Sequence, residues 1–424
     1  DFDRQFRDVP YMLADLLRQE KQNEGSFDAL QLVQGRRMID ALAAKTTAPT
    51  ADAPLTAGEV RGLLARVGED AVLVDFAVNR DGLTGYIFAG PELHVVYVAG
   101  NPSALGEADQ GDVREREARL VSLCLNNSML QELATAVAAV VPPDSRLMIV
   151  TDQLLNNLPL HAVPVNGRSW SDQMPIGYLP TAAVLRFPSS ANHHNSVLVA
   201  GDSRGDLPGA AEECRTVSAA LNASALLGQA CTQAAIEDAL RKAQPSIVHL
   251  AVHGRGDPRF GGRSSLLLAD GKGGVEWVDF QALTAFPWTA KLVVFSGCST
   301  GVIGRRHGSQ LLSVANAALE AGATSVVASL WPVDDEYAKS FMTAFYQDLT
   351  SIRPNESADL RLLLRQARES ASQQSRQSSG NVRRDGRHFG HPIADQPPAT
   401  TDPLVADALM WAPFCLFGDP VLRL

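Results

Sequence analysis

The sequence has no apolar run long enough to cross a membrane. No uninterrupted apolar stretch approaches the roughly 20 residues that a membrane-spanning helix needs, although hydrophobic residues make up 45% of the chain. The first residues, Asp1 to Tyr11, alternate acidic and basic side chains with isolated aromatics, which predicts neither a signal peptide nor a transit peptide. We therefore expect a cytoplasmic protein without membrane insertion.

Cysteine is scarce and lacks paired spacing. The chain has five cysteines and no CxxC pair. An odd number scattered over so long a chain argues against a disulfide framework and against a zinc site. We expect a reducing cytosol, no metal and no organic cofactor. The five are Cys124, Cys214, Cys231, Cys298 and Cys415.

Basic runs and phosphate loops are also missing. The net charge is −10, and no cluster of Lys and Arg could neutralise a line of phosphates, so nucleic-acid binding is not expected. The glycines at 261–262 and 271–274 do not lead from a strand into a helix with a Gly-Lys-Ser/Thr ending. A nucleotide-binding or transferase protein is therefore disfavoured.

The first half of the chain predicts helices followed by a sheet. Residues 1–45 show leucines at helical spacing in two segments, and 46–66 read as a linker that begins with Thr, Ala and Pro. Three strand-like segments then predict an antiparallel meander, and one long helix is expected from about Asp112 to Val140 before the strand Leu147–Val150. The meander segments are Ala71–Val78, Leu83–Phe88 and Leu93–Val98.

The second half, from residue 195 to 424, changes rhythm. Four short apolar runs alternate with helical patterns, which predicts an α/β fold with a largely parallel sheet flanked by helices. In such sheets, functional groups gather just past the carboxyl ends of the strands. The polar stretch 370–402 predicts a mobile insertion. The four runs are Val197–Ala200, Ile247–Val252, Leu292–Phe295 and Ser325–Leu330.

Two of these strand ends carry reactive side chains. One strand ends in His253 and then Gly254, and the other ends in Gly297 and Cys298. A nearby imidazole lowers the pKa of a thiol and can protonate a leaving amine, so these residue types suit a cysteine peptidase. The backbone N–H groups of Gly254 and Cys298 are candidates for an oxyanion hole.

Each of these residues also has a structural interpretation. A lone cysteine at a strand end is more often a small core residue than a nucleophile. His249 lies on the same strand as His253, and we expect it to be a hydrogen-bonded core or supporting histidine. Asp257 is a weaker candidate for orienting the imidazole of His253, and Gly201-Asp202 is expected to form a strand-to-helix turn.

Four ordered blocks resemble the CHAT domain, a caspase-like peptidase module found in bacteria. The resemblance spans roughly Val67 to Leu424, and a further block, RLMIVTDQLLNNLPLHAV, resembles the front half of that domain. It implies a caspase/separase-type fold in two halves: a pseudo-catalytic front half at 67–190 and a catalytic half at 195–424. It also places the family's catalytic pair on His253 and Cys298. The four blocks are VHLAVHG, LVVFSGCSTG, GATSVVASLWPVDD and WAPFCLFGDP.

The resemblance extends to substrate choice. The segment ending in Asp334 and Asp335 is similar to the separase segment that recognises a substrate arginine, so either residue, Asp335 above all, is a candidate for a pocket that binds a basic side chain. The alternative is that one of them caps the following helix. We expect a protein substrate that is a specific partner, a regulatory partner at the N-terminal helices, and a role in bacterial regulation, antiviral defence or cell death.

Two functions from different classes remain at this point. The first is a cysteine endopeptidase that forms an acyl-enzyme on Cys298. The second is a catalytically silent caspase-like scaffold that binds a partner protein. The scaffold stays open because Gly297 and Ser299 stand beside the cysteine where family members commonly have Ala and Glu.

Overall fold

The computed structural model describes residues 2–44, 53–107, 113–142, 144–187, 194–258, 261–305, 311–353, 356–379, 400 and 402–423. The chain forms two compact units. The first comprises Asp1–Pro188 and Arg305–Leu311, and the second comprises Ser189–Gly304 and Leu312–Leu424.

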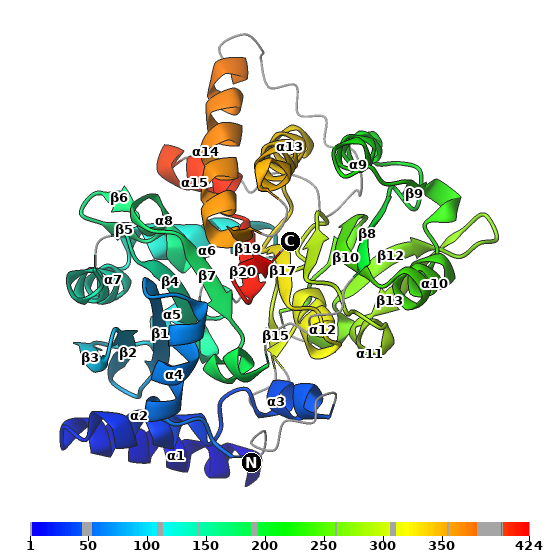
Figure 1. Ribbon diagram of the computed structural model, residues 1–424. Coiled ribbons are helices and arrows are strands. Elements are labelled where there is room, and N and C mark those ends of the chain that lie inside the picture. The colour runs from blue at the N-terminus through cyan, green and yellow to red at the C-terminus, as the bar shows by residue number, and fades with distance from the viewer. Residues whose placement is uncertain are drawn as a thin grey trace. The chain divides into compact units, whose positions relative to one another are not determined.

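The sheet of the first unit has the strand order β3-β2-β1-β4-β7 (Figure 1). Its first three strands form the predicted antiparallel meander, and the last two run parallel to β1. All eight positions of β1, among them Leu73 and Phe76, are buried because both faces of this strand are covered. The strands are β1 (Ala71–Val78), β2 (Gly82–Ala89), β3 (Glu92–Ala99), β4 (Arg146–Val150) and β7 (Ile176–Leu179).

Residues 2–43 form three helices where two were predicted: α1 (Phe2–Gln19), α2 (Asn23–Gln31) and α3 (Arg36–Ala43). The last two separate at Gly35, whose φ of +61° interrupts a helix and suits glycine. Phe27 of α2 packs on Phe88 with ring centroids 4.8 Å apart. The helices thus belong to the core of the first unit.

Two further predictions for this unit were wrong. The expected linker contains a helix, α4 (Ala57–Val67), which Thr56 caps and which buries Val60, Leu63 and Leu64 at helical spacing. The single long helix is two, α6 (Val113–Asn126) and α7 (Ser128–Val140), because the Asn127 side chain accepts from Leu130 N at 3.0 Å and starts a new helix.

Short elements complete the first unit. They are α5 (Ser103–Glu107), α8 (Trp170–Gln173), the strand pair β5 (Pro164–Val165) and β6 (Arg168–Ser169), and the 3₁₀ turns η1 (Gln153–Leu155), η2 (Leu160–Ala162) and η3 (Ala182–Arg186).

The sheet of the second unit has the order β19-β17-β14-β10-β8-β9. The four predicted strands are neighbours and run parallel, whereas β19 pairs antiparallel with β17. This confirms the largely parallel sheet expected from the apolar runs. The strands are β8 (His194–Gly201), β9 (Ala225–Leu227), β10 (Pro245–Ala251), β14 (Leu292–Phe295), β17 (Ser325–Ser329) and β19 (Phe414–Gly418).

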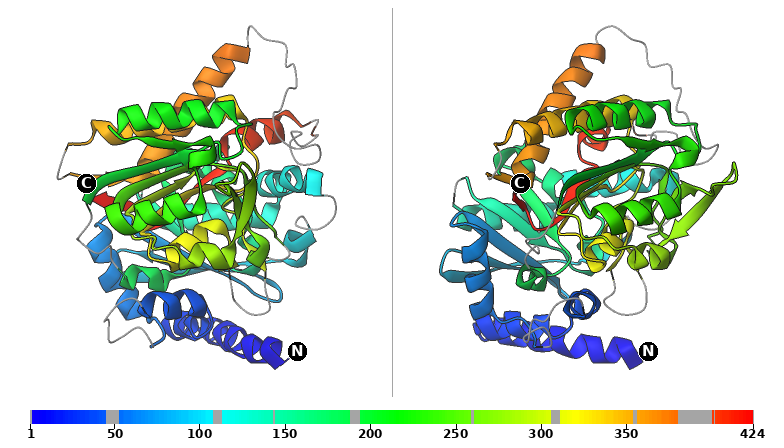
Figure 2. Two further views of the ribbon diagram at one scale, coloured as in Figure 1. Left: turned by 90° about the vertical axis from the view of Figure 1, so that its right-hand side faces the viewer. Right: turned by 45° about the vertical axis from the view of Figure 1, so that its right-hand side comes forward.

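Helices cover both faces of this second sheet (Figures 1 and 2). On one face, α9, α13 and α14 bury a core that includes Phe341, Phe345 and Leu364 against the strands. On the other face lie three shorter helices. The helices are α9 (Pro208–Ala220), α13 (Asp335–Ser351) and α14 (Leu360–Ser379) on the first face, and α10 (Gln233–Ala243), α11 (Phe280–Ala285) and α12 (Val314–Glu320) on the second; α15 (Pro403–Trp411) precedes β19.

The start of the predicted mobile insertion is helical. Helix α14 continues to Ser379, and Ala371 within it is fully buried together with Leu360, Leu364 and Ala367. The polar composition concealed this because one apolar face suffices to hold a helix on a core. The rest of the predicted insertion lies outside the described residues, apart from 400 and 402.

Small sheets surround the second core. One joins β11 (Gly254–Arg255), β12 (Ser265–Ala269) and β13 (Val275–Asp279), with the turn η5 (Gly261–Arg263) before β12, and η4 (Gly228–Ala230) follows β9. A second pairs β18 (Ser357–Asp359) with β20 (Val421–Arg423). The strands β15 (Gly304–Arg305) and β16 (Leu311–Leu312) also pair, at the two ends of the chain segment Arg305–Leu311 that belongs to the first unit.

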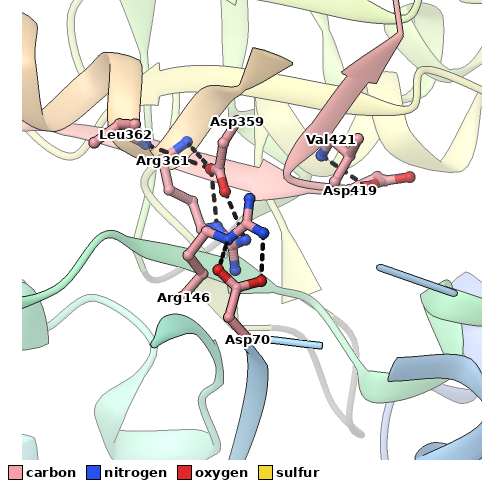
Figure 3. A network of polar contacts seen from close by, with 7 residues as sticks. All are labelled: Asp70, Arg146, Asp359, Arg361, Leu362, Asp419 and Val421. Atoms are coloured by element: carbon pink, nitrogen blue, oxygen red, sulfur yellow. Dashed lines mark hydrogen bonds and ion pairs between the residues drawn. The ribbon is translucent and has the colours of Figure 1, made fainter. Parts of the chain in front are cut away.

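Charged pairs lie at the ends of several elements, and Figure 3 shows one such pair from each unit. In the second unit, the buried Arg361 pairs with Asp359 through Nη2 and Oδ2 at 2.9 Å, at the junction of β18 and α14. In the first unit, Arg146 of β4 forms a bidentate pair with Asp70 just before β1, with Nε 2.5 Å from Oδ2.

None of the helices in the described ranges combines the length and apolar character needed for a bilayer crossing.

Candidate active site

The sheet register brings His253 and Cys298 to the same edge. Strands β10 and β14 are parallel neighbours, and Leu250 pairs with Phe295. His253 and Cys298 each follow three residues beyond one member of that pair. Parallel strands carry equal numbers of residues to the same end of a sheet, so both side chains emerge at one carboxyl edge. Ser296 N donates to Leu250 O at 2.9 Å, which extends the pairing toward the site.

The backbones of these two strand ends touch each other. A Cβ on Gly254 would lie 2.5 Å from the carbonyl oxygen of Cys298, and one on Gly297 would collide with the carbonyl oxygen of Val252. Real side chains do not tolerate such distances, so both positions need glycine. This contact involves the carbonyl group of Cys298, and the N–H groups of Gly254 and Cys298 remain candidates for the oxyanion hole.

The loop that carries Cys298 is hydrogen-bonded to the end of β17. Ser329 Oγ of β17 donates to Gly297 O at 2.7 Å, and Gly301 N donates to Ser329 O at 2.8 Å. Ser299 has a φ of +55°, a left-handed conformation that is uncommon for a residue other than glycine and marks a sharp turn. This turn leaves Cys298 half-exposed.

The other cysteines differ from Cys298 in environment. Cys124, Cys214, Cys231 and Cys415 are all buried. Burial raises the pKa of the Cys231 thiol to about 12, and it does the same for Cys415. Cys124, Cys231 and Cys415 are thus core residues. A thiolate is far easier to form at an accessible site such as that of Cys298.

His253 contacts two charged residues that sequence reasoning missed. Its Nε2 lies 2.9 Å from Asp206 Oδ1 and 3.2 Å from Arg204 Nη2. Arg204 also donates from Nε to Asp206 Oδ2 at 2.6 Å. Partial burial opposes ionisation of Asp206, but the hydrogen bonds from Arg204 and His253 outweigh it and lower the pKa of the carboxyl.

Both residues lie on the loop between β8 and α9, just past the carboxyl end of a neighbouring strand. The expected turn at Asp202 is confirmed: its φ is +47° and its Oδ1 accepts from Leu207 N at 2.8 Å. Their position past a strand end in Asp-Ser-Arg-Gly-Asp was the available signal. For Asp257, the structure gives a bond from its backbone N to Ser264 Oγ at 3.2 Å.

His249 is a buried hydrogen-bonded histidine, as predicted. Its Nδ1 lies 3.1 Å from the Tyr346 hydroxyl of α13, and its Nε2 lies 2.9 Å from Glu213 Oε1 of α9. All three side chains are within the core. The histidine thus connects two helices to β10 beneath the site.

The two aspartates at the start of α13 have separate positions. Asp334 is the helix cap, since its Oδ1 accepts from Tyr337 N at 3.1 Å. Asp335, the first residue of the helix, is exposed and faces α9: a Cβ on Gly209 would lie 3.4 Å from Asp335 Cβ. Gly209 is three residues beyond Asp206, so Asp335 lies against the start of the helix that follows the loop contacting His253.

No group of three or more metal-binding side chains occurs among the described residues.

The fold is that of the caspase-like cysteine peptidases. Separase from Saccharomyces cerevisiae, in its complex with securin, superposes with a TM-score of 0.54 at 9% sequence identity, over 94% of this chain and 34% of separase. The chain thus spans about a third of the length of that protein. Arg-specific gingipain R is also similar, with a TM-score of 0.46 at 10% identity over 70% of this chain and 68% of gingipain.

The CHAT domain family model matches residues 119–419. The chain therefore belongs to the CHAT domain family, and the resemblance read from its motifs is confirmed. No curated protein matches the sequence.

Proposed function

We propose that the chain is a cysteine endopeptidase in which Cys298 is the nucleophile and His253 its acid/base partner. The observation that supports this best is the register of β10 and β14, which sends both residues to one sheet edge beside the touching Gly254 and Cys298 backbones. A half-exposed cysteine in a tight turn next to a histidine suits nucleophilic catalysis.

The reaction follows from these groups. The imidazole takes the thiol proton, and the thiolate sulfur attacks the scissile carbonyl carbon to give a tetrahedral oxyanion. The N–H groups of Gly254 and Cys298 stabilise that oxyanion. The imidazolium then protonates the leaving amine as the C–N bond breaks, and water, deprotonated by the same imidazole, hydrolyses the thioester and restores the thiol.

We further propose that Asp335 favours a basic residue before the scissile bond. Asp335 is exposed and lies against the start of α9, the helix that follows the loop contacting His253. A carboxylate at such a rim pairs bidentately with a guanidinium. Asp334 is a weaker candidate because its carboxylate is already engaged in capping α13.

The test is cleavage of a peptide library varied at the residue before the scissile bond. Wild type is expected to cut after Arg or Lys, and Cys298→Ala is expected to cut nothing. If wild type is inactive on every peptide and a peptidyl electrophile leaves Cys298 unmodified, the scaffold function is favoured instead. Cleavage that persists in Cys298→Ala would contradict the proposed nucleophile.

Family membership supports a setting for this activity: a cytoplasmic bacterial peptidase in a regulatory, antiviral-defence or cell-death pathway, with one specific protein as substrate. The N-terminal helices offer a place for a regulatory partner, because α1 exposes Val9, Met12, Leu13 and Leu16 at helical spacing. Hydrogen exchange in α1 should slow when the protein substrate or its regulator binds. Unchanged exchange in the complex would contradict this role.

A further inference from the structure

The atom that Arg204 and Asp206 share is His253 Nε2. Asp206 Oδ1 is 2.9 Å from it and Arg204 Nη2 is 3.2 Å from it. An ionised carboxylate only accepts hydrogen bonds and a guanidinium only donates them. Nε2 therefore needs a proton to bond with Asp206, and it must be bare to bond with Arg204, so the two contacts cannot both be hydrogen bonds at the same time.

These two bonds correspond to different states of the catalytic base. When Nε2–H faces Asp206, the other nitrogen, Nδ1, is bare and can take the thiol proton. When Arg204 donates to Nε2 of the neutral ring, the proton sits on Nδ1, which then cannot serve as the base. Because Nε2 faces this loop, Nδ1 is the nitrogen that would take the proton of Cys298 in the proposed dyad.

Arg204 also forms an ion pair with Asp206, so the guanidinium competes with His253 for the same carboxylate. Two other charged groups near this edge have contacts elsewhere. The guanidinium of Arg255 lies over the Trp277 ring, 4.6 Å from its centroid, and Asp202 accepts from Leu207 N.

We propose that Asp206 and Arg204 are opposed positioning residues that set the protonation state of His253. Asp206 holds the ring in the tautomer that can activate Cys298. Arg204 favours the other tautomer, in which Nδ1 carries the proton and cannot act as the base. Both act through His253, so this inference rests on the proposed dyad.

Alkylation of Cys298 by iodoacetamide tests this without a substrate. The rate would be followed from pH 5 to 10 by peptide mass spectrometry, since thiolates react and thiols do not. The other four thiols are buried, and burial raises their pKa values. Modification of the native protein therefore reports on Cys298.

The variants are Arg204→Met, Asp206→Asn and His253→Gln. Arg204→Met should raise the rate near neutral pH by about threefold to tenfold, and Asp206→Asn should lower it by a similar factor, as expected for one charge removed from a partly exposed site. The control is Arg241→Met on α10, an exposed arginine paired with Glu237 at 3.5 Å, which should leave the profile unchanged. Thermal unfolding of each variant confirms that it folds.

The outcomes separate this inference from the proposed function. A rate that falls in His253→Gln but is unaffected by Arg204→Met and Asp206→Asn keeps the dyad and overturns the opposed pair. A fall in both Arg204→Met and Asp206→Asn would also overturn it, because Arg204 would then support the base. An alkylation rate of Cys298 that is unchanged in His253→Gln would contradict the dyad itself.

Discussion

Gly254, which follows the candidate base, lies directly against the carbonyl group of Cys298, the candidate nucleophile. A methyl group at Gly254 would sit 2.5 Å from that carbonyl oxygen and 2.7 Å from Thr300 Cγ2. Thr300 is buried and its hydroxyl lies 3.2 Å from Gly297 O, so the nucleophile loop has little room to yield. The absence of one side chain thus fixes the separation of the two reactive groups.

The first prediction follows from this contact. Gly254→Ala should push the Cys298 loop away from His253 and lower kcat/KM by about a hundredfold, since displacements near 1 Å can have that effect on catalysis. The matched control is Gly262→Ala, where an added Cβ meets nothing within 4 Å. Peptide cleavage by the two variants and wild type checks this, and full activity in Gly254→Ala would refute the packing argument.

The position of His253 and Cys298 at one sheet edge could be predicted from sequence because each residue follows a strand that is clearly apolar. The buried residues 247–252 before His253 and 292–295 before Cys298 define the strands, and parallel pairing then brings their ends together. Asp206 could not be found in this way. It contacts His253 from a loop 47 residues earlier, and whether that loop reaches the site depends on the turn at Asp202 and on the position of β8 beside β10.

The same distinction holds for the fold. Strand positions and the parallel sheet were predictable because buried strands are continuous apolar runs. The boundaries of helices were not: Asn127 divides one expected helix into two, and α14 extends through a polar stretch by means of a few small or apolar residues such as Ala371. Capping and one-sided burial are local details that composition averages away.

Asp334 and Asp335 give a second prediction, in which neighbouring carboxylates have different roles. Asp335→Ala should relax the preference for Arg or Lys before the scissile bond and leave stability nearly unchanged. Asp334→Ala should lower the free energy of unfolding by about 1 kcal/mol, because α13 loses its cap, and leave the preference intact. Library cleavage and urea titration of both variants distinguish the roles; the reverse pattern would assign the pocket to Asp334.

A third prediction concerns two charged pairs made by α9, one with β10 and one with α13. Glu213 and His249 are buried, with Oε1 and Nε2 2.9 Å apart. Removing one partner leaves a buried charge or donor without compensation, so Glu213→Ala should lower the free energy of unfolding by about 3 kcal/mol. Denaturant titration measures this loss.

The adjacent residue supplies the control. Glu212 pairs with Lys339 at the same 2.9 Å, but this pair is on the surface. Glu212→Ala should therefore lower the free energy of unfolding by less than about 1 kcal/mol. Similar losses of unfolding free energy in the two variants would mean that burial does not make the Glu213–His249 pair more stabilising than the surface pair.

The final prediction is a pH dependence of stability that arises in the first unit. Asp75 is buried in β1, and burial raises its pKa to about 7, although Gln34 and Gln31 donate to its carboxyl group. Between about pH 4 and pH 7 the folded state keeps this proton and the unfolded state releases it. The contribution of Asp75 to the free energy of unfolding should thus fall as pH rises through that window, by at most about 1.4 kcal/mol per pH unit.

Asp75→Asn holds no ionisable proton, so its stability relative to wild type should increase from pH 4.5 to pH 7 in urea titrations. The exposed Asp81→Asn should show no such trend, and a constant difference between Asp75→Asn and wild type at both pH values would show that Asp75 is ionised in the folded protein throughout.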